Sequence, residues 1–553
     1  MALALAAAGV CPAAAPAQTA GSGRQAPRLT PISPFATAPG RVRTMGIVVA
    51  TARRVGKVDA VLRRRPGAYA QAYLRDRGRW QVSWFAPRPG PDAEIAQVTL
   101  SDRTGRVLEA WTGVQVAWTM ARGYPGAFGA TATALYVWLG LLGLFALPFL
   151  RRPWRMLHLD LAVLASLSVS LAFFSHGRIG ASVPLAYPPL LYLLGRLLWL
   201  AGRRGAGTGR QPLVLRIGPT SLLAGIAFLL AVRLGLQLVA SNVIDVGYAG
   251  VIGADRLGHG SVLYGHFPLD NPRGDTYGPL NYLAYLPFEL LWPWHGGWDD
   301  LPSAHAATAA FDLVCVALLF VVGRRSRSST HGLLLAYLWL AFPFTLLAAN
   351  SGANDPLVGA LVLGAVGLAG RPAMRGAVVA GAALTKLAPF GLLPLLAGSR
   401  RAGLAATAVL AALLGLVAIL DGGLGGLWSR TVAFQAGRDS PFSIWGLYDL
   451  RVEQHLVQVA AVALAVGVAF VPRRRDPVAL AALAAAVLIA VQLGVSHWFY
   501  LYLVWFLPAA FVALLGRYEV SAGRSTGSIE SAPPAAEQRI STALIHGSSS
   551  AAP

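Results

Sequence analysis

The chain has little cysteine, little lysine and few charges. Its 553 residues include two cysteines, Cys11 and Cys315, which exclude a framework of several disulfides and a metal site built from cysteines. Only Lys57 and Lys386 are lysine among 46 basic residues, and 13% of the chain is charged whereas 55% is hydrophobic. Soluble globular proteins do not combine these values, so the composition indicates a membrane protein.

Long apolar runs account for most of the chain. Each is about 16–22 residues long, close to the ~20 that a helix needs to cross a hydrocarbon core. Because the bilayer offers the backbone no hydrogen-bond partners, such segments must be helices. The segments are 129–150, 158–175, 184–202, 219–240, 304–323, 331–349, 355–370, 402–420, 454–472, 477–494 and 499–515. We therefore expect an all-α polytopic membrane protein with about eleven full transmembrane helices.

The arginines predict how these helices are oriented. They cluster in short loops, which places those loops in the cytoplasm. The clusters are Arg151-Arg152-Pro153-Trp154-Arg155, Arg203-Arg204, Arg324-Arg325-Ser326-Arg327, Arg371 with Arg375, Arg400-Arg401 and Arg473-Arg474-Arg475. Two further apolar stretches, 277–294 and 376–397, begin and end on one side and contain proline, so we expect bent or re-entrant segments. The net charge of +22 follows from this loop pattern, and no basic stripe with aromatics predicts nucleic-acid binding.

Four regions flank or precede the main apolar part. Residues 1–20 have the small, apolar composition of a signal peptide or anchor. Residues 40–125 alternate like short strands, after a helix-like stretch from Arg63 to Leu74, which predicts a small extracytoplasmic α+β domain. Trp80, Val82 and Trp84, with Asp102 and the turn that follows it, resemble a PepSY-type module. Residues 128–205 add further transmembrane helices, and the 518–553 tail is expected to be disordered and cytoplasmic.

Reactive side chains collect in the loops that this topology places outside. Asp245 follows an apolar helix, and the loop after it ends at Asp275 and Tyr277. Lys386 lies midway along the bent segment 376–397, where an ionisable group is costly and indicates a function. Arg438 lies in a later outer loop. The other candidates are Tyr248, Asn350, Asn354, Asp355, Ser440, Trp445 and His497.

Several candidates have a structural alternative. Asn350 and Asn354 would serve equally well to cap the helix that starts at Asp355-Pro356. His497 would equally anchor the membrane interface together with Trp498 and Tyr500. Asp245 would be an ordinary loop carboxylate, and Arg438 would simply pair with Asp439.

The chemistry of the outer group suits a lipid-phosphate substrate. Lys386 and Arg438 are cations able to hold a phosphate. Asp245 and Asp275 are carboxylates able to accept a proton from a hydroxyl. Aromatic side chains such as Trp445 offer flat faces for a sugar ring or a lipid chain. No cluster with metal-ligand spacing is present in the sequence, so we expect neither a metal nor another cofactor.

The order of these motifs resembles the GT-C superfamily of membrane glycosyltransferases, and within it the family 87 polyprenyl-phosphate-mannose-dependent α-mannosyltransferases. The matching patterns lie within 219–515. They are Asp245 with Tyr248, G-x-x-L-Y at 260–264, T-Y-G-P-L at 276–280, A-N-S-G-A-N-D-P at 349–356, A-A-L-T-K-L-A-P at 382–389 and F-Q-A-G-R-D-S-P-F-S-I-W-G at 434–446. Ser-Gly-Ala replaces the family's usual Gly-Gln at 351–353, which puts the roles of Asn350 and Asp355 in doubt.

The resemblance implies a GT-C fold, with Asp245 as the general base and Lys386 and Arg438 on the donor phosphate. The donor would be a polyprenyl-phosphate sugar, and the acceptor a cell-envelope glycan or glycolipid. The reaction would take place on the extracytoplasmic face of the cell membrane. Two other functions stay open: a transporter or flippase of a lipid-linked sugar, and a membrane-anchored sensor that acts through its outer domain. A transporter would require charges near the middle of the membrane, whereas the charges expected here lie at the outer rim.

Overall fold

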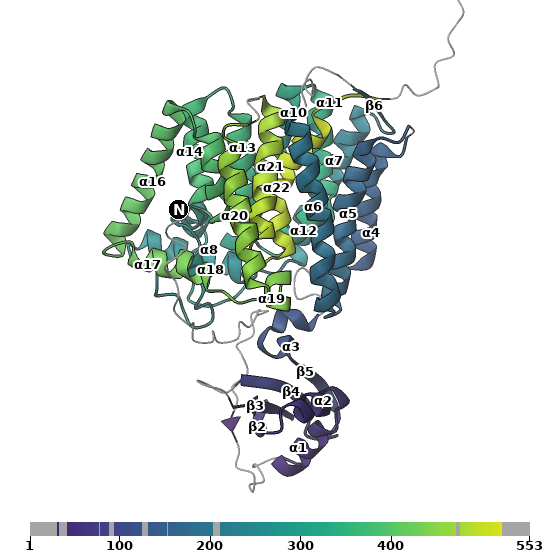
Figure 1. Ribbon diagram of the computed structural model, residues 1–553, viewed down its shortest axis with the longest axis vertical. Helices are drawn as coiled ribbons and strands as arrows, with labels where there is room; N and C mark the ends of the chain where they lie inside the picture. The colour runs from purple at the N-terminus through teal and green to yellow at the C-terminus, as the bar shows by residue number, and fades with distance from the viewer. Residues whose placement is uncertain are drawn as a thin grey trace, which may run out of the picture.

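A computed structural model of the chain describes residues 30–31, 41–76, 78–87, 93–123, 131–151, 153–202, 211–471 and 476–522. Figure 1 shows a bundle of upright helices with a small sheet domain at one end. The signal-like segment 1–20 and most of the 518–553 tail lie outside the described residues. Residues 518–522, expected to be disordered, form a strand instead.

The sheet domain has helices α1 (Met45–Arg53) and α2 (Gly56–Arg64) packed on an antiparallel sheet. Its strands, in spatial as well as chain order, are β1 (Thr30–Pro31), β2 (Tyr69–Asp76), β3 (Arg79–Ala86), β4 (Ala93–Ser101) and β5 (Val107–Thr112). The α+β composition agrees with the sequence analysis. The prediction of a helix from Arg63 to Leu74 was wrong. Helix α2 ends before Pro66-Gly67, and the alternating residues that follow pair with β3.

Asp102 joins the start of the sheet domain to its core. Its carboxylate accepts hydrogen bonds from the amides of Val42 and Arg43, both at 3.0 Å, and from the buried Trp80 indole at 2.8 Å. Burial raises the pKa of Asp102, but these three donors and the nearby Arg41 outweigh it, and the pKa is lowered overall. The carboxylate therefore stabilises the domain in its ionised form.

The helical part contains every apolar segment that the sequence predicted. Connecting elements α3 (Val114–Ala117) and η2 (Thr119–Arg122) lead into it. Its first helices are α4 (Leu135–Ala146), η3 (Leu147–Phe149), α5 (Met156–Ser175), α6 (Ile179–Gly202), α7 (Pro219–Val239), α8 (Asp245–Gly258), η4 (Gly274–Thr276), α9 (Pro279–Glu289), α10 (Pro302–Ser326), α11 (Ser329–Ala341) and α12 (Pro343–Asn350). The later ones are α13 (Asp355–Gly367), α14 (Pro372–Ala383), η5 (Ala388–Leu392), α15 (Leu393–Leu396), α16 (Arg400–Leu420), α17 (Gly425–Leu427), η6 (Trp428–Ala433), α18 (Phe434–Ala436), α19 (Ile444–Tyr448), α20 (Arg451–Gly467), α21 (Pro477–Leu493), η7 (Tyr500–Tyr502) and α22 (Leu503–Leu515).

Fewer of these helices than expected are long enough to cross a membrane alone. Among the described residues, α5, α6, α7, α10 and α16 qualify, and α11 with α12 makes a sixth span if the pair counts as one across its 61° bend. Helices α4, α13, α21 and α22 are apolar but shorter. The structure thus agrees with a multi-pass membrane protein, while the expected number of about eleven crossings is not established.

The two ends of the bundle are different. Strands β6 (Gln211–Leu215) and β7 (Tyr518–Ala522) pair in parallel at the end far from the sheet domain (Figure 1). Near them, Arg216 donates its amide to Pro148 and the Arg327 guanidinium bonds to the carbonyl of Gly516. We call this the basic end. The opposite end, called the sheet end, carries α8 and α17 to α19.

The helices also contain buried charges that the sequence analysis did not weigh. Arg196 pairs with Asp160 at 2.9 Å between α6 and α5, and Arg233 pairs with Asp312 at 2.9 Å between α7 and α10. The expectation that charges lie only at the outer rim was therefore wrong. Arg233 also donates to the carbonyls of Trp339 and Leu340, which the bend between α11 and α12 leaves without helical partners.

Asp102→Ala should loosen the sheet domain, because it removes an acceptor for three donors and leaves the Trp80 indole buried without a partner. We expect a loss of roughly 2–3 kcal/mol in the stability of this domain. The measurement is the rate of limited trypsin digestion of the full chain at neutral pH. Asp59→Ala is the control, because its exposed ion pair with Arg63 contributes little. Equal digestion of the two variants would contradict the assignment.

In the wild-type protein the sheet domain should also be digested faster at low pH, which is measured with pepsin because trypsin is inactive in acid. A carboxylate with a lowered folded pKa contributes its full stability above the unfolded value of 3.8 and loses it as the pH falls through the folded pKa. Asp102→Ala should lack that part of the acid response.

Candidate functional site

The bent segment 376–397 forms a helical hairpin. Helix α14 ends at Ala383, the chain turns through 384–387, and η5 and α15 lead back. The Arg375 side chain, at the start of the hairpin, donates to the carbonyl of Leu396 at its end, at 2.8 Å. Both ends therefore lie together, as the sequence predicted for a re-entrant segment. Lys386 occupies the tip of the hairpin.

The hairpin tip is attached to the start of α9 through the backbone. The amide of Gly278 donates to the carbonyl of Thr385 at 3.1 Å, and the amide of Leu280 donates to Leu384 at 3.0 Å. These bonds supply partners for carbonyls at the helix break. A Cβ on Gly278 would lie 2.0 Å from the Leu384 oxygen, so only glycine permits this approach. The contact places Tyr277 beside Lys386.

Lys386 lies in a box of aromatic and acidic side chains. Its ammonium is 2.6 Å from Asp355 Oδ1 and lies over the rings of Tyr277, Trp505 and Tyr502 at 5.3, 5.1 and 5.7 Å from their centroids. The Trp505 indole donates to the same carboxylate oxygen at 2.6 Å. The lysine is 8% exposed. A buried ammonium requires such an ion pair and such ring faces.

The first turn of α13 positions Asp355, as the Asp355-Pro356 sequence predicted. The preceding Asn354 occupies the N-cap position but does not cap with its side chain. It donates instead to Asn281 Oδ1 at 2.6 Å. Asp355 Oδ2 is buried and has no hydrogen-bond partner in the described residues. The capping alternative for Asn354 is therefore wrong, and one carboxylate oxygen remains available beside Lys386.

Asp245 is the first residue of α8 and is held by the connection that precedes it. The amides of Asn242 and Ile244 donate to the carbonyls of Asn350 and Ser351, both at 3.1 Å. The Asp245 side chain is accessible, yet the surrounding protein desolvates the carboxylate and raises its pKa above the usual 3.8. Arg438 and Lys386 are near enough to oppose this increase. The structure thus brings the three residues predicted to form the centre into one electrostatic neighbourhood.

Arg438 lies in the loop before α19 and is half-buried. Its guanidinium lies over the Phe434 ring at 5.5 Å from the centroid. Its charge acts on the ionisation of Asp245, Tyr277 and His497, which locates it between the Lys386 box and the last outer loop. The alternative that Arg438 simply pairs with Asp439 is not favoured, because Asp439 pairs with Arg451 at 3.4 Å.

His497 and Ser440 lie near Arg438, and we call this pair the wall of the site. Ser440 Oγ and His497 Nδ1 are 2.9 Å apart. Burial and the nearby Arg438 lower the pKa of His497, so its imidazole is neutral near pH 7. Trp498 and Tyr500 are 6% and 2% exposed, and the Tyr500 hydroxyl bonds inside the bundle. These two aromatics therefore do not form an interfacial belt.

The segment that leaves the sheet domain contacts this wall. The Trp118 ring lies 5.9 Å from the His497 ring and 5.4 Å from that of Phe442, centroid to centroid. A Cβ on Gly123 would lie 2.1 Å from the amide nitrogen of Gly177, and Gly123 has φ +68°, so the segment approaches the start of α6 closely. The sheet domain is thus connected to the candidate site by direct packing.

Other predicted site residues lie outside this centre. Asp275 is buried and accepts from the Gly265 amide at 2.7 Å, with Arg430 at 3.3 Å. Burial raises the pKa of Asp275, and the Gly265 amide and Arg430 oppose it. Tyr248 is fully buried and donates to Asp270, and the Trp445 indole donates to Leu493. These residues support the loops around the site. Asn350 contributes mainly its backbone carbonyl, although its side chain donates to Leu236 at 3.4 Å.

Sequence reasoning missed Tyr502, Trp505 and Trp118. Tyr502 and Trp505 are three residues apart, so a helical reading puts them on one face, and their rings stack at 4.3 Å. That spacing was visible in the last apolar segment. Nothing local pointed to Trp118, because its partners come from the far end of the chain.

No protein-family model matches the chain, and neither do any curated proteins or solved structures. Within the described ranges, no three His, Cys, Asp or Glu side chains are grouped so as to hold a metal ion.

Gly278→Ala should separate the hairpin tip from α9, because the added methyl overlaps the Leu384 carbonyl. We expect a destabilisation of about 1–3 kcal/mol, typical of overpacking. The measurement is thermal unfolding of the purified protein. Gly370→Ala is the matched control, since a Cβ there meets nothing within 4 Å. If both variants melted at the wild-type temperature, the close approach at Gly278 would be wrong.

Proposed function

We propose that the protein is a membrane glycosyltransferase that moves a sugar from a polyprenyl-phosphate donor to a hydroxyl of a cell-envelope glycan or glycolipid. The observation that carries this proposal is the exposed Asp245, whose ionisation is influenced by Arg438 and by Lys386, the partner of Asp355. A base and phosphate-holding cations in one place are the two requirements of such a transfer. The family resemblance supplies mannose as the sugar and the extracytoplasmic side as the site of reaction.

The proposed reaction is a direct displacement at the anomeric carbon. Asp245 takes the proton of the acceptor hydroxyl, whose oxygen forms the new bond to that carbon. The bond between the anomeric carbon and the phosphate oxygen breaks, and its electron pair leaves with the polyprenyl phosphate. Arg438 and Lys386 stabilise the departing charge. The configuration at the anomeric carbon is inverted, as the resemblance implies.

The formal charges of the centre suit this reaction. Two carboxylates, Asp245 and Asp355, balance two cations, Lys386 and Arg438. A phosphodiester donor brings one negative charge, and the leaving phosphate gains a second. The proton accepted by Asp245 removes one negative charge from the protein in the same step. The total charge in a poorly solvated site therefore stays constant.

The buried charges elsewhere in the bundle give the transport alternative some support. Arg233–Asp312 and Arg196–Asp160 are charges inside spanning helices, which transporters use for coupling ions. Arg233, however, also satisfies backbone carbonyls at the α11–α12 bend, which is a structural task. Sugar release from a labelled polyprenyl-phosphate donor in membranes separates transfer from transport.

Asp245→Asn should abolish sugar transfer while the protein still inserts and folds, because an amide cannot accept the hydroxyl proton. We expect a decrease in kcat of about 100-fold or more. The measurement is product formation from labelled donor in purified membranes. Asp439→Asn is the matched control, since Asp439 is 78% exposed and pairs with Arg451. A fully active Asp245→Asn enzyme would remove Asp245 from the mechanism.

The wild-type enzyme should also show an acid limb that belongs to Asp245. Because its pKa is raised, the base should become protonated, and activity should fall, at a pH above the usual 3.8 for aspartate. Asp245→Glu, if active, should shift this limb. An unshifted profile would assign the limb to another group.

Lys386→Ala should weaken use of the donor, because it removes one of the two cations. The KM for the donor should increase about ten-fold or more. The single variant also leaves Asp355 buried without its partner, which is costly by itself. The double variant Lys386→Met with Asp355→Asn removes both charges and should regain stability but not donor affinity. Normal donor affinity in the double variant would exclude a role for Lys386 in phosphate binding.

A further inference from the structure

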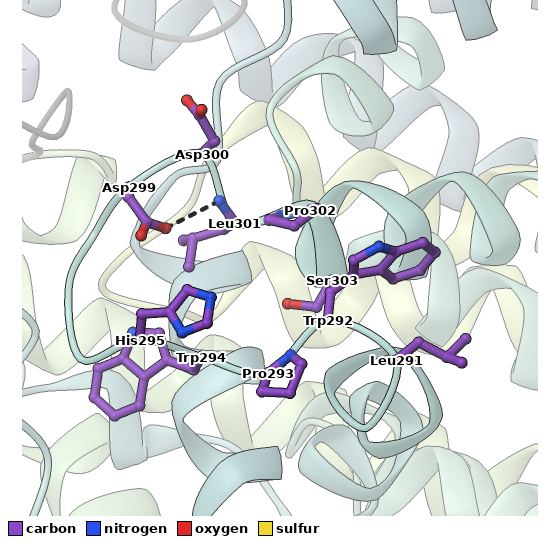
Figure 2. Close-up of a pocket in the computed structure, with 10 residues that line it drawn as sticks. All are labelled: Leu291, Trp292, Pro293, Trp294, His295, Asp299, Asp300, Leu301, Pro302 and Ser303. Atoms are coloured by element: carbon purple, nitrogen blue, oxygen red, sulfur yellow. Dashed lines mark hydrogen bonds between the residues drawn. The ribbon is translucent and has the colours of Figure 1, made fainter.

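A pocket of about 380 Å³ lies in the connection between α9 and α10. Its lining residues are Leu291, Trp292, Pro293, Trp294, His295, Asp299, Asp300, Leu301, Pro302 and Ser303. Figure 2 shows Asp299, His295 and Trp294 on one side and Leu291, Trp292 and Pro293 on the other, with Ser303 between them. The volume is at the lower end of the range for small-ligand pockets.

The pocket wall is attached to the chain on both sides of Asp245. The Trp298 indole, in the same connection, donates to the carbonyl of Val243 at 3.0 Å. Three residues after Asp245, the Tyr248 ring stacks on Trp298 at 4.9 Å and meets Trp294 edge-on at 6.0 Å. The pocket and the proposed base therefore share one rigid support.

The chemistry of the lining selects against phosphate. It contains two carboxylates and no lysine or arginine, so an anion would be repelled. Asp300 is exposed and its charge acts on His305, and Trp292 is 45% exposed. A carboxylate accepts hydrogen bonds from hydroxyl groups, and an indole face packs on the C–H face of a ring. A neutral, hydroxyl-rich ligand such as a sugar ring meets both requirements.

The backbone at the edge of the pocket is strained. Leu301 has φ +42°, which is unusual for a bulky residue, and is buried. Its amide is held by Asp299 Oδ1 at 3.2 Å. Such a conformation costs about 1–3 kcal/mol and is found where the surroundings enforce it, often at ligand sites. Here it directs the chain from the acidic pair Asp299-Asp300 straight into α10.

We propose that this pocket binds the neutral sugar of the acceptor, with the ring against Trp292 and its hydroxyls on Ser303 and His295, which Figure 2 shows on the inner side of the pocket. The inference rests on the proposed function and deepens it, because it assigns the charged donor and the neutral acceptor to separate sites. The anionic donor goes to Arg438 and Lys386, and the neutral acceptor goes to the acidic and aromatic pocket. The exposed Leu290 and Leu291, at the end of α9, are next to the pocket and suit a lipid-linked acceptor.

The test measures binding of simple sugars to the full chain in phosphatidylglycerol nanodiscs. Methyl α-mannopyranoside, methyl α-glucopyranoside and methyl α-arabinofuranoside are the probes, and saturation-transfer NMR is the readout. We expect at least one glycoside to bind. Trp292→Ala and His295→Ala should each weaken its binding about ten-fold, the effect of losing one polar or aromatic contact. Trp154→Ala, which removes a tryptophan that is 63% exposed at the basic end, should bind as wild type.

Three results would overturn the inference. They are no binding of any glycoside, unchanged binding in both pocket variants with a wild-type melting temperature, and displacement of the glycoside by choline, which would make the pocket a site for organic cations. The Asp245→Asn transfer assay is independent of this binding. Glycoside binding that depends on Trp292, together with full transfer by Asp245→Asn, would leave the sugar site standing and remove the proposed function.

Discussion

The buried ion pair between Lys386 and Asp355 is the constraint on which the candidate site depends. Its members come from the tip of the hairpin and the first turn of α13, and Trp505 of α22 donates to the same carboxylate. Neither charge is tolerated alone in an apolar environment, so the pair requires all three elements to meet. Tyr277 and Tyr502 then cover the ammonium with their ring faces. The location of the pair between the helices fixes the place of the proposed phosphate site.

The site is assembled from helix ends, and the reason is the backbone. Wherever a helix breaks among apolar residues, its last carbonyls need donors that the bilayer cannot supply. At the hairpin tip the donors are the amides of Gly278 and Leu280; after α12 they are the amides of the segment before Asp245; at the α11–α12 bend the donor is Arg233. The first two sets of hydrogen bonds each hold a segment that carries a candidate site residue, Tyr277 in one case and Asp245 in the other. The hydrogen bonds that satisfy the backbone therefore also position these side chains.

The arrangement also separates cationic from acidic side chains and connects the sheet domain to the cationic part. Cations lie at the hairpin and in the loop before α19, whereas the pocket between α9 and α10 is acidic and aromatic. The sheet domain reaches the wall of the site through Trp118, which packs on His497, the partner of Ser440.

The sequence alone determined the helical membrane class, the sheet domain, the bent segment around Lys386 and the grouping of Asp245, Lys386 and Arg438 at one end. These follow from apolar run length, alternation, internal proline and the cost of a lone charge, all of which are local properties. The tertiary structure decided that Asp355 neutralises Lys386, that Asp275 supports a loop with Arg430, and that fewer helices than expected are long enough to span a membrane alone. Partners such as Trp505 and Asp355 are 150 residues apart, and nothing in either segment specifies the other. Only packing, which buries a charge and then requires a counter-charge beside it, selects such a pair.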